Sequence, residues 1–375
     1  MHLPARYLNE VAGEILDSTT VSSNDDVIAT PMNITSIGVG TIALIKCSGT
    51  ASVDGQHQNW SAIVKVVDLE APNAVGATDP NSSVWSEIWA YRDELFTSQS
   101  PEFRGAKCYR IDDRGDGQFW IWMEDLSGYS GSHWTKYEYR LAARGIGEFK
   151  GSWLNKNTSA IDWLPPVSRD ENLESNSLLL SNQENYRKLE NSDYFRSALP
   201  GDLYQRLVSL RELMPSFVKA AARVPRILAH NDCHIRNLFA ASDLSEIVTI
   251  DFARVAVAPI GGDAGDLLGS SFMWTDPEAE TAMLIADDIY SDWLNGLKST
   301  GWQGSNEIAR FGFLFPILRR AIMVPGMLAW VALGSDFPLR RYGGSKNDMP
   351  TSIRQRFEFL LPLADEGSVL ARQLN

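Results

Sequence analysis

"LAHNDCHIRNLF", residues 228–239, gathers five polar or charged side chains in one short stretch: His230, Asp232, His234, Arg236 and Asn237. Two interpretations of this stretch are open. The spacing H-x-D-x-H is typical of a metal-binding cluster and would indicate a metallohydrolase. Asp232 and Asn237, separated by four residues, could instead form a loop that presents a carboxylate to a substrate hydroxyl and an amide oxygen to magnesium, which would indicate a phosphotransferase.

Residues outside this stretch favour the phosphotransferase interpretation. Phosphoryl transfer requires bound phosphates, a placed metal ion and an acceptor hydroxyl oriented near a carboxylate. Lys65 is a cation on a predicted strand, and Glu87 on the following predicted helix can pair with it. Such a pair would fix the lysine so that it can bind phosphates. Asp251 ends the apolar run "IVTID", where a carboxylate at a strand end is a natural magnesium ligand. Each of the three also has an ordinary alternative, as an exposed lysine, an exposed helix residue or a turn former.

A glycine-containing segment, "GVGT" at residues 38–41, links two predicted strands. Gly38 and Gly40 would let the backbone approach phosphates closely. An ordinary hairpin turn explains the same pattern equally well, so the segment alone does not decide the function.

Composition and charge narrow the class of protein. The chain has 375 residues, 44% of them hydrophobic, which is enough to bury a large core. Its net charge of −13 argues against a nucleic-acid partner, because phosphate backbones attract basic surfaces. Three widely spaced cysteines indicate a reducing compartment rather than a disulfide framework. The N-terminus shows no signal-peptide pattern, and the most apolar late stretch is interrupted by Arg319, Arg320 and Pro325, so we expect a cytoplasmic protein without a membrane span.

The two parts of the chain differ in the structure that they predict. Short β-rich runs dominate from about Val27 to Met123, with a single helical segment, "VWSEIWAYRDELF", between the second and third run. After Asp125 a Gly/Ser-rich piece leads into mainly amphipathic helical sequence. The exception is "EIVTIDFARV", a β-branched run shortly after residues 228–239.

These motifs together resemble the aminoglycoside phosphotransferase and choline kinase families. "HNDCHIRN" matches the families' catalytic loop H-x-D-x-x-x-x-N, and "TIDF" matches their metal-binding motif I-D-[FW]. Asp263 follows Asp251 by twelve positions, where the family carries an acidic residue that braces the catalytic loop. "IWMEDLSG" resembles the family's hinge between lobes. One departure is Asn231, since many antibiotic kinases have glycine at that position and choline kinases have asparagine.

The resemblance implies an α+β, protein-kinase-like fold with two lobes. An N-terminal lobe (residues 1–123) would hold an antiparallel sheet with one helix and bind the nucleotide. A hinge (residues 124–129) would lead to a larger, mainly helical C-terminal lobe (residues 130–375) with the catalytic loop and the acceptor site. Only twelve residues separate the metal motif from the next acidic position, which leaves no room for a protein kinase's activation segment. The acceptor is therefore expected to be a small molecule.

The resemblance also implies a role for each candidate residue. Asp232 would be the catalytic carboxylate, and Asn237 and Asp251 would bind Mg²⁺. Lys65 would hold the phosphates of ATP, with GTP as the alternative nucleotide, and Glu87 would position Lys65. The residues implied to contact the nucleotide through the backbone are Gly38, Gly40, Met123, Glu124 and Leu126. The residues implied to support the loop are His230 and Asp263, while Cys233 and His234 stay open between packing and substrate contact.

The predicted function is therefore ATP- and magnesium-dependent phosphorylation of a hydroxyl on a small molecule, either an antibiotic or an amino- or hydroxyl-bearing metabolite. The partners expected are this acceptor alone, with no nucleic acid and no membrane, and the chain could be a monomer or a homodimer. Two alternatives remain. A kinase-like fold could bind without catalysing, although Lys65, Asp232, Asn237 and Asp251 are all present. A metallohydrolase would need further ligands, yet the other histidines are isolated and no C-x-x-C motif occurs.

Overall fold

The protein is described by a computed structural model whose parts fall into two compact units. The described residues are 5–23, 27–32, 39–74, 76–77, 79, 82–97, 100–131, 133–168, 171, 189, 191–273, 276–336, 339 and 345–375. The first unit is Met1–Thr97 with Gly105–Tyr129 and Ile250–Ala253. The second unit is Ser98–Arg104 with Ser130–Thr249 and Arg254–Asn375.

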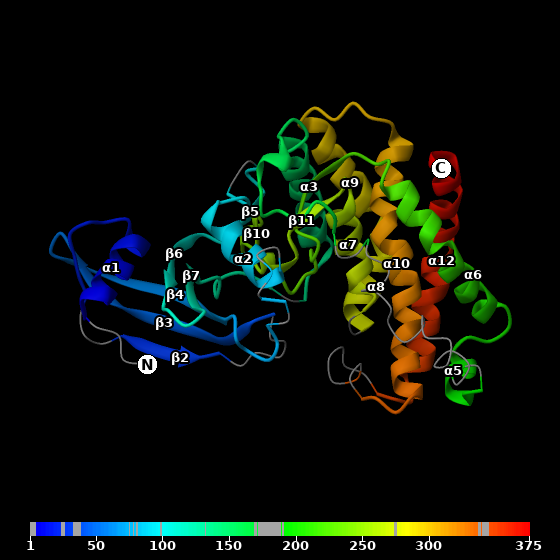
Figure 1. Ribbon diagram of the computed structural model, residues 1–375, viewed down its shortest axis with the longest axis horizontal. Helices are drawn as coiled ribbons and strands as arrows, with labels where there is room; N and C mark the ends of the chain where they lie inside the picture. Colours follow the sequence, from blue (N-terminus) through cyan, green and yellow to red (C-terminus); the bar gives the residue numbers. More distant parts are fainter. Residues whose placement is uncertain are drawn as a thin grey trace. The chain divides into compact units, whose positions relative to one another are not determined.

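The first unit is built on an antiparallel sheet in the order β1-β3-β4-β7-β6, with β2 also paired to β3 (Figure 1). Its strands are β1 (Val21–Ser23), β2 (Ile28–Pro31), β3 (Thr41–Val53), β4 (Gln56–Asp68), β6 (Cys108–Asp113) and β7 (Gln118–Glu124). The long β3–β4 hairpin turns on two residues, Asp54 and Gly55, which both have positive φ angles of 50° and 80°. An Asp-Gly pair favours this two-residue turn because glycine and aspartate tolerate the left-handed region, and the turn fixes the register of the whole hairpin.

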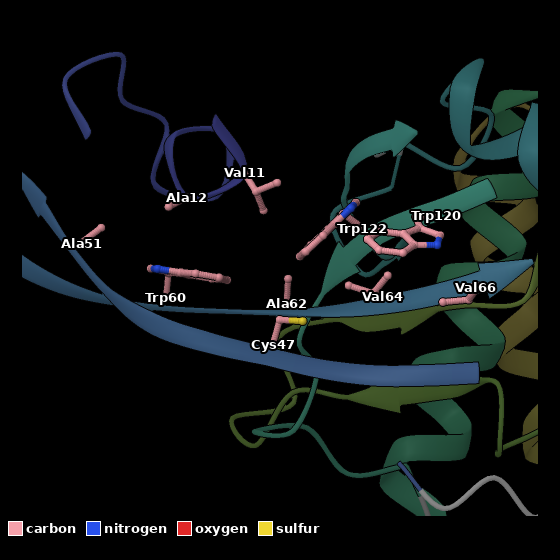
Figure 2. Packing of buried hydrophobic residues seen from close by; sticks show 10 residues of the cluster. All are labelled: Val11, Ala12, Cys47, Ala51, Trp60, Ala62, Val64, Val66, Trp120 and Trp122. Carbon is pink, nitrogen blue, oxygen red and sulfur yellow. The ribbon is translucent and has the colours of Figure 1, made fainter. Parts of the chain in front are cut away.

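One face of this sheet carries the core of the first unit (Figure 2). Alternate residues of β4 point to it, namely Trp60, Ala62 and Val64, because side chains of a strand alternate between the two faces. Val11 and Ala12 of α1 (Ala5–Leu16) pack over these side chains. The sequence pattern predicted only one helix in this region, so α1 is a second helix that it did not include.

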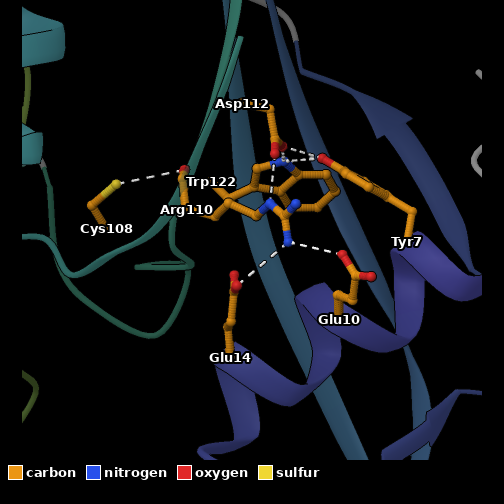
Figure 3. Close-up of polar contacts among 7 residues, drawn as sticks. All are labelled: Tyr7, Glu10, Glu14, Cys108, Arg110, Asp112 and Trp122. Carbon is orange, nitrogen blue, oxygen red and sulfur yellow. Dashed lines mark hydrogen bonds and ion pairs between the residues drawn. The ribbon is translucent and has the colours of Figure 1, made fainter. Parts of the chain in front are cut away.

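Polar contacts also attach α1 to the sheet (Figure 3). The Tyr7 hydroxyl donates to Asp112 and accepts from Trp122 Nε1 at 2.8 Å. Arg110 bonds Glu10 of the same helix at 3.2 Å. Burial and the neighbouring carboxylate of Asp112 raise the pKa of Tyr7, so its proton is retained as a hydrogen-bond donor.

The helix predicted between the strands is α2 (Ser83–Arg92). Gly40, just before β3, lies close to the start of this helix, and a Cβ there would stand 2.9 Å from Val84 Cγ2. Gly40 also has a φ of +72°. Both facts require glycine at this position.

The second unit is mainly helical, with two small sheets (Figure 1). Its helices are α3 (Lys136–Ser152), α5 (Asp193–Ala198), α6 (Leu203–Ala221), α7 (Gly262–Ser271), α8 (Asp276–Leu284), α9 (Ala286–Ser299), α10 (Asn306–Ala332) and α12 (Met349–Leu374). The backbones of α3 and α9 approach closely, since a Cβ on Gly147 would stand 2.2 Å from Trp293 O. Helix α10 is long and apolar enough to cross a membrane, but 89% of its apolar window is buried inside the protein.

Two antiparallel strand pairs frame the polar stretch at residues 228–239. The strands are β8 (Arg226–Ala229), β9 (Leu238–Ala240), β10 (Ile247–Thr249) and β11 (Ala256–Pro259), with β5 (Phe103–Gly105) beside β10. Ala229 pairs with Ala256, and Leu238 pairs with Thr249. The loop between β8 and β9 therefore starts beside the first residue of β11 and finishes beside the last residue of β10. An antiparallel sheet with two helices, followed by a mainly helical part, confirms the predicted α+β fold class.

Candidate active site

A buried ion pair lies at the centre of the first unit. Strand β4 directs Lys65 away from the core face, and the Lys65 Nζ lies 2.6 Å and 2.7 Å from the two carboxylate oxygens of Glu87 on α2. Both residues are buried. The structure thus brings together the lysine and the glutamate that the sequence paired. Since both oxygens of Glu87 face the ammonium group, the lysine side chain is held in one geometry.

Asp251 belongs to the same unit and approaches the same lysine. Its Oδ1 lies 3.4 Å from Lys65 Nζ, and its side chain is 28% exposed, so a ligand can reach it. Its φ of +65° is unusual for a residue other than glycine. Phe252 anchors this conformation by stacking on Phe96, with ring centroids 4.4 Å apart. Burial alone would lower the pKa of Lys65, but Asp251 and Glu87 raise it above its usual range, so the lysine stays a cation.

The face of the sheet around Lys65 offers a half-open apolar surface. In the strand register Leu44 lies opposite Lys65, while Ile63 lies opposite Met123 on the same face. Leu44 and Ile63 are half-buried and Met123 is buried. Apolar side chains of this kind suit contact with the face of a purine ring.

The predicted base-binding backbone follows Met123. The Glu124 N–H already donates to Lys107 O at 2.9 Å, and the Ser127 N–H donates to Asp125 Oδ1 at 3.0 Å. These two N–H groups are therefore already engaged within the protein. Of the two predicted phosphate-loop glycines, Gly40 is the one that packs against α2, and Gly38 lies outside the described residues.

The catalytic-loop candidates lie together in the second unit. Asn237 Nδ2 donates to the Asp232 carbonyl at 3.1 Å and to Asp232 Oδ2 at 3.2 Å. His234 Nε2 is 3.7 Å from the same Oδ2, and Arg254 lies 3.5 Å from Oδ1. The Asp232 carboxylate thus accepts a hydrogen bond from Asn237 and lies near the side chains of His234 and Arg254.

These neighbours determine the charge of Asp232. Burial alone would raise the pKa of its carboxyl group. His234, by its charge and its hydrogen bond, together with Arg254 and His230, outweighs burial and holds the pKa well below its usual range. Asp232 is therefore ionised at any pH at which the protein would work.

Asp263 supports the start of this loop. Its Oδ2 accepts from the His230 N–H at 3.0 Å, and its Oδ1 accepts from the Asn231 N–H at 2.8 Å. The Asn231 backbone has a φ of +61°, a conformation that glycine and asparagine tolerate best. Asn231 Nδ2 also donates to Arg254 O at 3.1 Å. The left-handed backbone accounts for an asparagine at this position.

Two residues at this site were not among those predicted. Arg254 follows the "IDF" motif directly, so its position next to the motif was the available signal. Lys150 on α3 is fully buried and lies 2.6 Å from Asp263 Oδ2. It shares a helix face with Ala143 and Ile146, which lie seven and four residues earlier and are both buried. A charged residue in line with apolar positions was therefore a readable signal, although lysine on a helix usually faces solvent.

The donor atoms suit a hard cation. Asn237 uses its amide nitrogen for both contacts with Asp232, so its Oδ1 takes part in neither bond. Asp251 keeps an exposed carboxylate. Amide and carboxylate oxygens are ligands that Mg²⁺ accepts. Within the described ranges, no group of three His, Cys, Asp or Glu residues forms a compact metal site, which gives the metallohydrolase interpretation no ligand set.

A lysine–glutamate pair on a sheet and helix, an aspartate after a short strand and an Asp/Asn loop define a kinase-like class of protein. Residues 96–297, more than half of the chain, match the phosphotransferase enzyme family known as APH. The chain belongs to this family, and the predicted resemblance is confirmed. It is accordingly an enzyme of the small-molecule phosphotransferase class.

Solved structures with a similar fold share little sequence with this chain. The AMP-bound complex of spectinomycin phosphotransferase, APH(9)-Ia, gives a TM-score of 0.51 at 11% identity, covering 97% of this chain and 98% of that one. A choline/ethanolamine kinase family protein from Mesorhizobium loti gives a TM-score of 0.49 at 12% identity, covering 92% of each chain. At these identities the likeness concerns the fold alone. No curated protein matches the sequence.

Proposed function

We propose that this protein transfers the terminal phosphoryl group of ATP, with Mg²⁺, to a hydroxyl of a small molecule. The observation that carries the proposal is the buried Lys65–Glu87 pair with Asp251 beside it. A lysine held by two carboxylates remains charged and fixed, which is what gripping phosphates requires. A chain that only binds ligands has no need to keep such a pair together with an intact Asp232–Asn237 loop.

Each residue then has a definite task. Lys65 binds phosphate oxygens and Glu87 keeps its ammonium group in place. Asp251 of the first unit and Asn237 of the second are each proposed as a Mg²⁺ ligand, and Mg²⁺ when bound neutralises charge on the phosphates. The half-buried Leu44 and Ile63 would contact the base. Support for a nucleotide here also comes from the fold's similarity to a phosphotransferase solved with AMP.

Asp232 orients the acceptor rather than removing its proton before transfer. A carboxylate whose pKa lies well below its usual range is a weak base. It is, however, a strong hydrogen-bond acceptor, and a hydroxyl donating to it would be aligned toward the phosphoryl group. In a loose transition state little proton transfer is needed until the new bond has largely formed.

The acceptor is proposed to be an antibiotic or an amino- or hydroxyl-bearing metabolite. The family to which the chain belongs supports a small acceptor. The described side chains do not identify that acceptor, so an unbiased screen is the appropriate experiment.

The test is Mg²⁺-dependent ATP consumption across aminoglycosides, macrolides, peptide antibiotics, amino alcohols, sugars and nucleosides. Once an acceptor is found, Asp232→Ala should lower kcat by about 10²-fold, the scale of a lost orienting contact, while sparing ATP affinity. Asp243→Ala is the matched control, because Asp243 is an exposed loop aspartate that bonds Ser245. Near-normal turnover of Asp232→Ala would refute the assignment. ATP binding without turnover on any acceptor would favour a non-catalytic binding protein.

A further inference from the structure

We propose that Lys150, a residue of α3, positions the catalytic loop by holding Asp263. This inference rests on the proposed function, because it assigns a role in setting the geometry of Asp232. Lys150 would touch neither nucleotide nor acceptor. It would act through a chain of contacts that lies wholly within the second unit.

The first link of that chain is a closed ion pair. Lys150 Nζ lies 2.6 Å from Asp263 Oδ2, and the two side chains are 0% and 3% exposed. The same Nζ donates to the carbonyl oxygen of Leu228 at 2.6 Å. Leu228 is in β8, two residues before His230. One ammonium group therefore joins the helix, the strand that enters the loop and the carboxylate beneath the loop.

The second link runs from Asp263 into the loop backbone. Its two oxygens accept the N–H groups of His230 and Asn231, at 3.0 Å and 2.8 Å. Asn231 directly precedes Asp232 and has the left-handed backbone that turns the chain there. A carboxylate is needed for this arrangement because it can accept from both amides and from the lysine at once.

Lys150 also determines the charge state on which the arrangement depends. Burial would raise the pKa of Asp263, but Lys150 and His230 lower it below its usual range. Without the lysine, a carboxylate this deeply buried would tend to take up a proton. In a protonated Asp263 the hydroxyl oxygen donates and becomes a much weaker acceptor, so it holds one of the two amides poorly. The loop would then lose one of its two anchoring hydrogen bonds.

A second buried ion pair, whose carboxylate is also on α7, allows a controlled experiment. Arg320 on α10 bonds Asp266 Oδ1 at 2.5 Å, with side chains 8% and 4% exposed. Asp266 lies three residues beyond Asp263 on α7, and among the described residues it forms no hydrogen bond to the loop. Lys150→Met and Arg320→Met each remove the cation of one buried pair. Both variants should lose stability, but only the first should disturb the loop.

The first measurement does not need an acceptor. Amide hydrogen exchange, followed by mass spectrometry on peptides covering residues 228–239, should be about tenfold faster in Lys150→Met than in the wild type, the factor that corresponds to one weakened hydrogen bond. Arg320→Met should leave exchange in these peptides within about twofold. Equal acceleration in both variants, or none in Lys150→Met, would overturn the proposal. This result stands whether or not phosphotransfer is detected, so its failure is distinct from failure of the proposed function.

The second measurement separates positioning from stability. In the double variant Lys150→Met/Asp263→Asn no buried charge is left without a partner, so the melting temperature should recover at least in part. Asparagine offers a single acceptor oxygen, so the loop amides should stay poorly held and kcat should stay about 10–100-fold below wild type, with the KM for ATP nearly unchanged. Recovery of kcat together with the melting temperature would show that Lys150 contributes only to stability and would overturn the proposal.

Discussion

Among the described residues, each unit contains one lysine buried against a carboxylate, and the two pairs differ in their surroundings. Lys65 bonds both oxygens of Glu87, and its third neighbour, Asp251, is 28% exposed. Lys150 bonds Asp263 and the Leu228 carbonyl, and the side chains of Lys150 and Asp263 are only 0% and 3% exposed. Similar short distances therefore occur in two different surroundings.

The difference indicates two uses of the same ion pair. A buried pair costs desolvation, so it contributes little to stability compared with well-packed apolar residues. Lys65 retains a reachable neighbour and can therefore exchange some of its contacts for those of a ligand. Lys150 uses its donors inside the protein and can act only through the carboxylate that it holds. The first pair suits binding and the second suits positioning.

The largest effect is expected when Lys65 of the first pair is replaced, and it should be a loss of turnover. Lys65→Met should lower kcat/KM by about 10³-fold, because a fixed charge on the phosphates is lost. It should also abolish the rise in melting temperature that ATP with Mg²⁺ gives to the wild type. Lys150→Met is the control, since it should keep most of that nucleotide-induced rise. If both variants lost it equally, the two pairs would not differ in the way described.

The sequence predicted the first pair because its members are close along the chain. Lys65 and Glu87 lie on consecutive elements, a strand and the next helix, and both element types were readable from local patterns. Catalytic-loop residues were equally readable because Asp232 and Asn237 share one loop. The alternation in β4 and the Asp54–Gly55 turn likewise made the sheet predictable, since each depends on local rules.

The second pair could not be recognised in this way. Lys150 and Asp263 are 113 positions apart, and the tertiary packing of α3 against α7 and the strand β8 brings them together. A lysine near the end of an amphipathic helix is ordinarily solvent-exposed and favourable to the helix dipole. Helix α1 was missed for a related reason. It is held by contacts from Tyr7 to Asp112 and Trp122, more than 100 residues away, and no local motif announces them.

The next largest effect is on stability through Lys150. Lys150→Met should lower the free energy of unfolding by about 3 kcal/mol, the lower end of the range for breaking a buried pair, because Asp263 keeps two amide donors. Chemical denaturation followed by tryptophan fluorescence would measure it. Arg140→Met, which breaks the exposed pair with Asp292, should cost less than about 1 kcal/mol. Equal losses for the two would mean that the Lys150 pair is not closed to solvent.

A smaller effect is the pH dependence of that stability difference. The pKa of Asp263 is lowered from 3.8 in the folded wild type, so its charged form stabilises the fold above about pH 3.8 and this contribution is lost as the pH falls. Removing Lys150 should leave burial dominant and reverse the direction of the pKa shift, with His230 and the Asn231 N–H as the groups that still favour the charge. The stability gap between wild type and Lys150→Met should therefore narrow as the pH is lowered from about 6 toward 4. Other carboxylates titrate in both proteins and cancel in the difference, so a gap that widens on acidification would contradict the account.

The smallest of these effects on stability is expected at Tyr7, whose partly buried hydroxyl makes contacts that involve no lysine. Tyr7→Phe removes the hydroxyl that donates to Asp112 and accepts from Trp122, yet Trp122 Nε1 still donates to Asp112 at 3.0 Å. The carboxylate also keeps its bond from Arg110 at 2.5 Å. Because no group becomes unpaired, the cost should be about 1 kcal/mol, the net value of one ordinary hydrogen bond. A loss of unfolding free energy as large as that of Lys150→Met would mean that this hydroxyl, and not the apolar contacts of Val11 and Ala12, fixes α1. Burial of a cation would then not be what makes a substitution in this protein strongly destabilising.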